Sequence, residues 1–142
     1  NAVGKFKAEF GIETVGTDEI LYQDCDILSP NAMGGVLNSV SIPRIQAKII
    51  AGAANNQLAK EEYGYDLMTA GKVYAPDYAI NAGGLMNIYH ELDGYDSKKA
   101  HEHVAGIYKT IAQILERSQQ EKLPTHLIAN RIAEERIQAG RK

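Results

Sequence analysis

One segment, Lys-Ile-Ile-Ala-Gly-Ala-Ala at residues 48–54, constrains the fold of this chain more than any other. Its adjacent isoleucines predict a central strand of a parallel sheet, and the small residues after them predict a tight loop. Residues 25–28 and 73–76 are two more short apolar runs, and each meets a proline that stops a strand. Because loops and helical patterns separate the three runs, the sequence predicts an α/β layered fold with parallel strands.

Most of the remaining chain has a helical pattern. The clearest helix covers residues 97–117, where apolar residues recur at helical spacing and Asp96 stands at the N-cap position. Pro124 breaks this pattern, and a last helix follows it. The other expected elements are helices at residues 2–10, 61–69 and 85–92, a short helical piece at residues 42–47, a single turn at residues 18–21 and a short strand at residues 13–16.

Composition excludes several classes of protein. The chain has 142 residues, enough for one domain, and its 15 Lys and Arg against 18 Asp and Glu give a net charge of −3. Because no block of like charges occurs, we expect neither a nucleic-acid partner nor a lipid surface, and small neutral or polar partners are favoured. No apolar run approaches the roughly 20 residues that a membrane helix requires.

The single cysteine, Cys25, cannot form an intramolecular disulfide, so we expect a reducing compartment, by default the cytoplasm. The chain opens on Asn1 and an amphipathic helix, not on the charged and apolar regions of a signal peptide. We therefore expect the sequence to begin within a fold.

Three loops follow the expected strands, at residues 29–35, 53–56 and 77–84, and all are rich in Gly, Ala and Asn. Ligands of parallel sheets bind outside the carboxyl ends of the strands, so we expect these loops to converge at one edge. Asn side chains offer both a donor and an acceptor, which suits an amide or ribose hydroxyls. In the alternative interpretation, the pair Asn55 and Asn56 caps main-chain groups in a turn.

The sequence lacks the motifs of several common kinds of functional site. The dinucleotide fingerprint G-x-G-x-x-G and the P-loop do not occur, and no nucleophile has a base at a recognisable spacing. His101 and His103 point in different directions on a helix, and His90 and His101 would lie roughly 16 Å apart. A solvated helix face is therefore favoured over a metal site. Cys25 is expected to pack within its strand, and Lys72 to stabilise the carboxyl end of the preceding helix.

Four segments, in order along the chain, resemble motifs of the glutamate/leucine/phenylalanine/valine amino acid dehydrogenase family. They are CDILSPNAMGGVLN at residues 25–38, IIAGAANNQL at residues 49–58, YAPDYAINAGG at residues 74–84 and AEERI at residues 133–137. The family's motifs are similar, with Ala and Cys where Ser29 and Asn31 stand and commonly Asp at Asn55. The resemblance spans nearly the whole chain and is closest to the leucine-specific members.

The resemblance implies NAD-dependent oxidative deamination of an L-amino acid, branched-chain and leucine-like, to the 2-oxo acid and ammonium. Phenylalanine or tryptophan specificity is the nearest alternative, and a non-catalytic binding or assembly fragment is the alternative of another class. The family's catalytic lysine and aspartate and its glycine-rich loop have no counterpart in this sequence. We therefore expect the chain to be the C-terminal part of a longer subunit, inactive by itself, and the family implies a homo-oligomer.

The resemblance also implies a division of the chain. Residues 1–95 would form the second half of a Rossmann-like dinucleotide-binding domain. Residues 96–142 would form helices that pack on that domain and on an N-terminal catalytic domain.

Six residues match cofactor-binding positions of the family, and the resemblance assigns them by position alone. The first two would line the dinucleotide through their main chain, the next three would border the nicotinamide and its ribose, and the last would support the same pocket. This set is Ala32, Met33, Ala54, Asn55, Asn56 and Asn81.

Three residues match positions that contact the amino acid. Asn56 would reach the substrate as well as the cofactor, and Leu85 and Ile88 would line the pocket for its side chain, unless both belong to the core. Branched-chain members often have valine where Leu85 stands, whereas aromatic-specific members often have leucine. One methylene changes discrimination by only about 1–3 kcal/mol, so this difference leaves the substrate open. No residue of the chain is expected to bind a metal.

Overall fold

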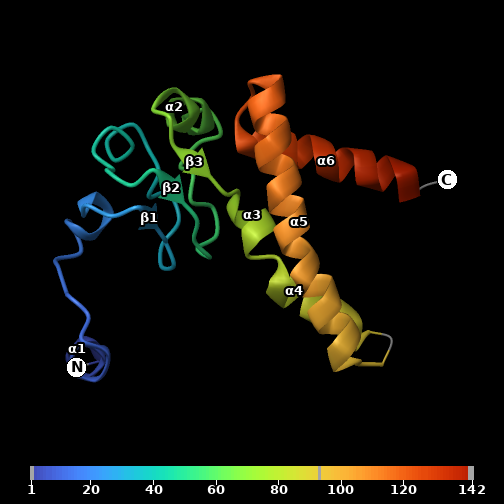
Figure 1. Ribbon diagram of the computed structural model, residues 1–142, viewed down its shortest axis with the longest axis horizontal. Coiled ribbons are helices and arrows are strands. Elements are labelled where there is room, and N and C mark those ends of the chain that lie inside the picture. The colour runs from blue at the N-terminus through green and yellow to red at the C-terminus, as the bar shows by residue number, and fades with distance from the viewer. Residues whose placement is uncertain (1, 93, 141–142) are drawn as a thin grey trace.

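The computed structural model describes residues 2–92 and 94–140 and contains a three-stranded parallel sheet with a group of helices beside it (Figure 1). The strands are β1 (Ile27–Leu28), β2 (Ile49–Ile50) and β3 (Val73–Tyr74), in the order β1-β2-β3. Both pairings are parallel. The prediction of parallel strands with residues 48–54 at the centre is therefore confirmed.

The sheet is covered on one face. Leu28, Ile50 and Tyr74 lie side by side in the ladder and are buried. Their neighbours Ile27, Ile49 and Val73 form the opposite row and are exposed. Parallel sheets usually have both faces covered. Among the described residues, nothing buries this second row.

The covered face packs against α2 (Tyr63–Thr69) and the segment at residues 36–47. These parts supply one apolar core, in which side chains lose contact with water and stabilise the sheet. Its buried members are Leu28, Leu37, Ile42, Ile45, Ala47, Ile50, Leu67 and Tyr74.

A second core lies among the C-terminal helices, where α4 (Gly83–Glu91) and α6 (Thr125–Gly140) both pack on α5 (Ser97–Glu121). It contains Ile114, Ile128, Ala129 and Ile132. The first helix stands apart from both cores and buries none of its residues (Figure 1). The first helix is α1 (Ala2–Phe10), and the remaining helical elements are η1 (Ile20–Tyr22) and α3 (Asp77–Ile80).

The expected long helix and its cap are confirmed. The Asp96 carboxylate accepts hydrogen bonds from the main-chain N–H groups of Lys98 at 2.9 Å and Lys99 at 3.2 Å. These bonds satisfy donors that have no partner within the helix. Helix α5 continues to Glu121, four residues beyond the expected end, and stops where Lys122 takes a left-handed φ of 56° before Pro124.

Ion pairs join α5 to α6 across the turn. Arg117 Nη1 on α5 and Glu135 Oε2 on α6 lie 2.8 Å apart. Within α5, Arg117 Nε and Glu121 Oε1 lie 2.9 Å apart. Glu121 also pairs with Arg131. The hydrogen bonds from Arg117 hold the pKa of the Glu135 carboxyl below its ordinary value. Charged side chains therefore supplement the apolar contacts between these two helices.

Two expected elements are wrong. Residues 13–16 are not a strand, because no neighbouring strand among the described residues offers them a ladder of hydrogen bonds. Residues 42–47 are not a helical piece, because residues 42–44 form turns and residues 45–47 are irregular, although Ile42 and Ile45 are buried as apolar residues of a helix would be. Conversely, the short helix α3 lies where the sequence shows no clean period.

Two side chains also differ from expectation. Cys25 precedes β1 and is exposed, so it does not pack within the strand. Lys72 does not serve α2, because its ammonium donates to the carbonyls of Ile45 at 2.7 Å and Ala47 at 3.1 Å. It therefore ties the end of the turn segment to β3. A search of the described residues for a helix long and apolar enough to cross a membrane finds none.

Candidate functional site

The three loops that follow the strands meet at the carboxyl edge of the sheet, as predicted. The main-chain N–H of Ala54 donates to Pro30 O at 2.9 Å, and that of Ala53 donates to Asn31 Oδ1 at 2.9 Å. Asn81 Nδ2 donates to Ala53 O at 3.2 Å. The loop after β2 is thus bonded to the loops after β1 and β3, and the three form one connected rim.

Glycine allows the main chains of these loops to touch. A Cβ atom on Gly52 would lie 2.2 Å from Pro30 O, and one on Gly34 would lie 2.7 Å from Asn55 O. No side chain fits at such distances, because the blocking atoms belong to the main chain. The small residues therefore serve contacts between loops, in addition to any approach of a ligand.

The asparagines at the rim have different partners. Asn55 Oδ1 accepts from Asn81 Nδ2 at 2.6 Å, and Asn31 bridges Ser29 O and Ala53 N. Asn56 has a left-handed φ of 54°, and its main-chain oxygen accepts from Gly35 N at 2.7 Å. Its carboxamide makes no hydrogen bond with any part of the chain that the structure describes. At the rim, the side chains of Asn31 and Asn81 thus bind main-chain groups, whereas the Asn56 side chain is free to bind a ligand.

Gln57 and Asp77 complete the site, and sequence reasoning missed both. Gln57 Nε2 donates to Gly52 O at 2.7 Å and to Ala54 O at 3.0 Å, and its main-chain N–H donates to Asp77 Oδ2 at 2.8 Å. Both side chains are buried. The sequence did signal their place, because Asp77 opens the third expected loop, Gln57 directly follows the second, and both lie within the motifs that resemble the family.

The other candidate residues lie around this rim. Ala32 and Met33 lie on the loop after β1 and line an apolar hollow of about 320 Å³ with Ile20, Leu28 and Val36 among others. This hollow is open and has few polar atoms, so it would accept the apolar part of a ligand.

Leu85 and Ile88 share an exposed face of α4. Their side chains are 74% and 56% exposed, so they do not belong to either core. The interpretation of both as core residues is therefore wrong for the described structure. An apolar pair at this exposure is available to line a pocket whose other wall is not among the described residues.

A second cavity, of about 170 Å³, lies behind the rim between Asn56 and α6. Burial lowers the pKa of His126, which lines it, and the charge of Glu61 opposes that effect. Neither ring nitrogen of His126 has a hydrogen-bond partner in the described ranges. Burial, and next the charge of Asp77, raise the pKa of Tyr78 to about 12. Both side chains therefore stay neutral near pH 7.

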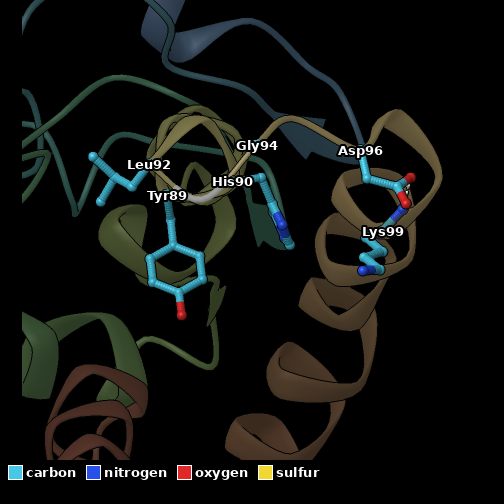
Figure 2. A pocket seen from close by; sticks show the side chains of 6 residues that line it. All are labelled: Tyr89, His90, Leu92, Gly94, Asp96 and Lys99. Carbon is cyan, nitrogen blue, oxygen red and sulfur yellow. Dashed lines mark hydrogen bonds between the residues drawn. The ribbon is translucent and has the colours of Figure 1, made fainter.

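A third pocket, of about 340 Å³, lies away from the rim, between the end of α4 and the start of α5 (Figure 2). His90 belongs to α4, and its Nε2 lies 3.2 Å from Nδ1 of His103 on α5. Helical spacing alone relates His101 to His103 and His90 to His101. It does not predict the pair of His90 and His103, which forms only when α4 packs on α5. Residues 2–92 and 94–140 contain no cluster of three or more His, Cys, Asp or Glu side chains that could hold a metal.

Known proteins resemble this chain over nearly its whole length. Leucine dehydrogenase of Bacillus subtilis is 48% identical over 134 residues, which are 94% of this chain and 37% of that protein. L-tryptophan dehydrogenase of Nostoc punctiforme is 47% identical over 137 residues, 96% of this chain and 39% of that protein. The chain thus spans less than half the length of either relative.

The crystal structure of L-tryptophan dehydrogenase from Nostoc punctiforme superposes with a TM-score of 0.93 and 46% identity, over 97% of this chain and 41% of that one. This likeness and the parallel sheet confirm the Rossmann-like α/β fold. The Glutamate/Leucine/Phenylalanine/Valine dehydrogenase family matches residues 1–142. The chain therefore belongs to the glutamate/leucine/phenylalanine/valine dehydrogenase family.

Proposed function

We propose that this chain supplies part of the NAD-binding domain and the C-terminal helices of an L-amino acid dehydrogenase. The reaction is oxidative deamination of the amino acid to a 2-oxo acid and ammonium. The observation that carries the proposal is the connected rim at the carboxyl edge, with the unpaired carboxamide of Asn56 in it. This is where a Rossmann-like sheet binds its dinucleotide.

The residues at the rim fit a nicotinamide. The carboxamide of that ring needs a donor and an acceptor, and Asn56 offers both. Ala54 and Asn55 border the nicotinamide and its ribose beside Asn56, and Asn81 supports the same pocket through its bonds to the loop. When bound, NAD accepts the hydride from the α-carbon of the amino acid.

The apolar hollow beside Ala32 and Met33 supports a second contact with the dinucleotide. Met33 is exposed there, and the hollow has few polar atoms. We place the main chain of these two residues along the cofactor, on the side of the rim that follows β1.

The substrate side chain lies against Leu85 and Ile88, and Asn56 also reaches the substrate. We favour a branched-chain, leucine-like amino acid, which the 48% identity to leucine dehydrogenase supports. Phenylalanine or tryptophan is the second candidate, and the likeness to L-tryptophan dehydrogenase supports it nearly as well. The residues that catalyse proton transfer belong to sequence beyond the 142 residues.

The uncovered row of Ile27, Ile49 and Val73 supports the division into domains. Residues 1–95 form part of the dinucleotide-binding domain, and further sequence of that domain covers this row. Residues 96–142 form helices that pack on it and on a catalytic domain. We place the complete enzyme in the cytoplasm as a homo-oligomer, on the strength of the single cysteine and of the family resemblance.

The test is an assay of the complete protein that contains these residues. Reduction of NAD, and separately of NADP, is followed by absorbance with L-leucine, L-valine, L-phenylalanine and L-tryptophan. We expect NADH formation, fastest with L-leucine. Faster reduction with an aromatic amino acid supports the second candidate. Binding of NAD without turnover of any amino acid would instead favour a binding or assembly module.

A further inference from the structure

In the loop after β2, the main-chain carbonyls accept hydrogen bonds from side-chain amides. Gln57 Nε2 donates to Gly52 O at 2.7 Å and to Ala54 O at 3.0 Å, and Asn81 Nδ2 donates to Ala53 O at 3.2 Å. A primary amide has two N–H groups, and Gln57 uses both here. The carbonyl oxygens of three successive residues, 52–54, are therefore already hydrogen-bonded within the protein.

These bonds determine what the loop presents to a ligand. The N–H groups of Ala53 and Ala54 are also bound, to Asn31 and Pro30. The main-chain N–H groups of Asn55 and Asn56 have no acceptor within the described structure. The rim thus offers main-chain donors at Asn55 and Asn56, whereas the carbonyls of residues 52–54 are already occupied by the side chains of Gln57 and Asn81.

Gln57 is itself held rigidly. Its main-chain N–H donates to Asp77 Oδ2 at 2.8 Å, and its carbonyl accepts from Leu37 N at 2.9 Å. Its side chain is fully buried, with 0% of the residue exposed. Water therefore cannot replace the two bonds to the loop, and each lost bond leaves a carbonyl without a donor.

We propose that Gln57 is a positioning residue, which does not touch the cofactor but holds the loop at residues 52–56 in the shape that binds the nicotinamide. This role rests on the proposed function. In this role, the buried Gln57 carboxamide keeps the Asn56 side chain and the free main-chain N–H groups of Asn55 and Asn56 in place at the rim.

Two variants of the complete enzyme test the role. Gln57→Met keeps the length of the side chain and removes both donors. Gln57→Glu keeps the shape, but an ionised carboxylate faces two carbonyl oxygens. A control is Gln46→Met, because Gln46 Nε2 also donates to a main-chain carbonyl, that of Tyr22 at 2.8 Å, on an exposed residue away from the rim.

We expect Gln57→Met to weaken NAD binding at least about tenfold, because the loop loses the two hydrogen bonds that hold its binding shape. Gln46→Met should leave the dissociation constant within about twofold. Binding is measured by titration well below the melting temperature of each variant. A lower melting temperature with unchanged NAD affinity would assign Gln57 a structural role only and overturn the proposal.

The Glu variant adds a readout that a general loss of packing would not give. A protonated carboxyl has one O–H and can donate to one of the two carbonyls. Burial and the nearby Asp77 carboxylate favour this protonated form. Tyr74, whose hydroxyl lies 3.4 Å from Asp77 N, and Tyr78, whose main-chain N–H donates to Asp77 Oδ1, are titratable groups beside that carboxylate. The NAD affinity of Gln57→Glu, relative to wild type, should therefore recover as the pH falls, whereas that of Gln57→Met should not. Parallel behaviour of the two variants contradicts direct donation.

Hydrogen exchange separates this proposal from the proposed function. Without NAD, the amides of Ala53 and Ala54, whose N–H groups are bound to the loop after β1, should exchange faster in Gln57→Met than in wild type or Gln46→Met. If exchange quickens but the wild-type enzyme binds no NAD, the loop is held as described and the proposed function fails. If exchange is unchanged, the positioning role fails, whatever the enzyme binds.

Discussion

Asn56 combines two properties that few residues offer. Its left-handed φ of 54° is tolerated by asparagine better than by most other residues with a side chain. Its carboxamide has no partner in the described structure, although its main-chain oxygen is bound by Gly35. The turn therefore holds the main chain in place and leaves the side chain for a ligand.

Replacing Asn56 tests whether that side chain acts on the reaction. Asn56→Gly accepts the same φ and removes only the carboxamide, so kcat/KM of the complete enzyme should fall more than about tenfold, or roughly 1.4 kcal/mol. Asn56→Ala should show the same kinetic loss and, because of its strained φ, a stability loss of about 1 kcal/mol. Steady-state kinetics and denaturant unfolding measure the two effects. Wild-type kcat/KM in the glycine variant would exclude Asn56 from the site.

Gly52 is required by packing between the loops. In Gly52→Ala the new Cβ would lie 2.2 Å from Pro30 O, and a main-chain atom cannot rotate away as a side chain can. We expect a loss of about 3 kcal/mol in the free energy of unfolding, the upper range for overpacking. Gly106→Ala is the matched control, because a Cβ there meets open space within α5 and should gain about 0.5–1 kcal/mol. Equal stabilities of the two variants would contradict the close approach of the loops.

At the scale of elements, α6 comes close to α2 because one residue of α2 has no side chain. A Cβ on Gly64 would lie 2.1 Å from Cε1 of His126. The imidazole therefore lies directly on the main chain of α2, where it is buried and lacks hydrogen-bond partners in the described ranges. Such a ring is stable there only while it is uncharged.

This contact makes stability depend on pH. Burial lowers the pKa of His126 in the folded chain, so the unfolded chain binds the proton more readily. The stabilisation is complete above the ordinary histidine pKa of about 6.5 and is lost as the pH falls from there to the lowered pKa of the folded state. In His126→Gln, the contribution of this residue to the slope of unfolding free energy against pH should disappear. Unfolding free energies measured from neutral to mildly acid pH check it, and identical slopes in wild type and variant would contradict it.

The elements that the sequence predicted are those with a local signal. Helix α5 has apolar residues at helical spacing and a capping Asp96, and both act within a few residues of the chain. The strand expected at residues 13–16 had a pattern but needed a neighbour, and pairing is not a local property. The segment at residues 42–47, turns followed by irregular chain, buries apolar side chains as a helix would, so periodicity could not distinguish it from a helix.

The candidate site likewise has a part that the sequence predicted and a part that it did not. Convergence of the three loops followed from parallel strands alone, and the structure brings Asn31, Asn55 and Asn81 together there. Gln57 and Asp77 were missed because a buried polar residue has no pattern until its partners are known. His90 and His103 were missed because only the packing of α4 on α5 joins them.

At the scale of the whole molecule, two apolar cores are joined by a short connection. One core lies under the sheet and the other lies between α5 and α6. Helix α3 lies between them and carries Tyr78 (Figure 1). The Tyr78 hydroxyl is 3.0 Å from His126 O and 2.6 Å from Asn130 Oδ1, both on α6. This hydroxyl therefore links the segment after β3 to the last helix.

Removing that hydroxyl tests whether the two cores act as one unit. Tyr78→Phe keeps the ring and removes the single O–H donor that these two acceptors on α6 share, so we expect a loss of about 1 kcal/mol in the free energy of unfolding. Tyr108→Phe, on a side chain that is 80% exposed, should change stability by less than about 0.5 kcal/mol. Hydrogen exchange locates the effect. If the link matters, the amides of α6 exchange faster in Tyr78→Phe while those of β2 keep their protection, because the core under the sheet does not depend on this bond. Equal acceleration in both elements would mean instead that the chain opens as a single cooperative unit and that Tyr78 is one contact among many.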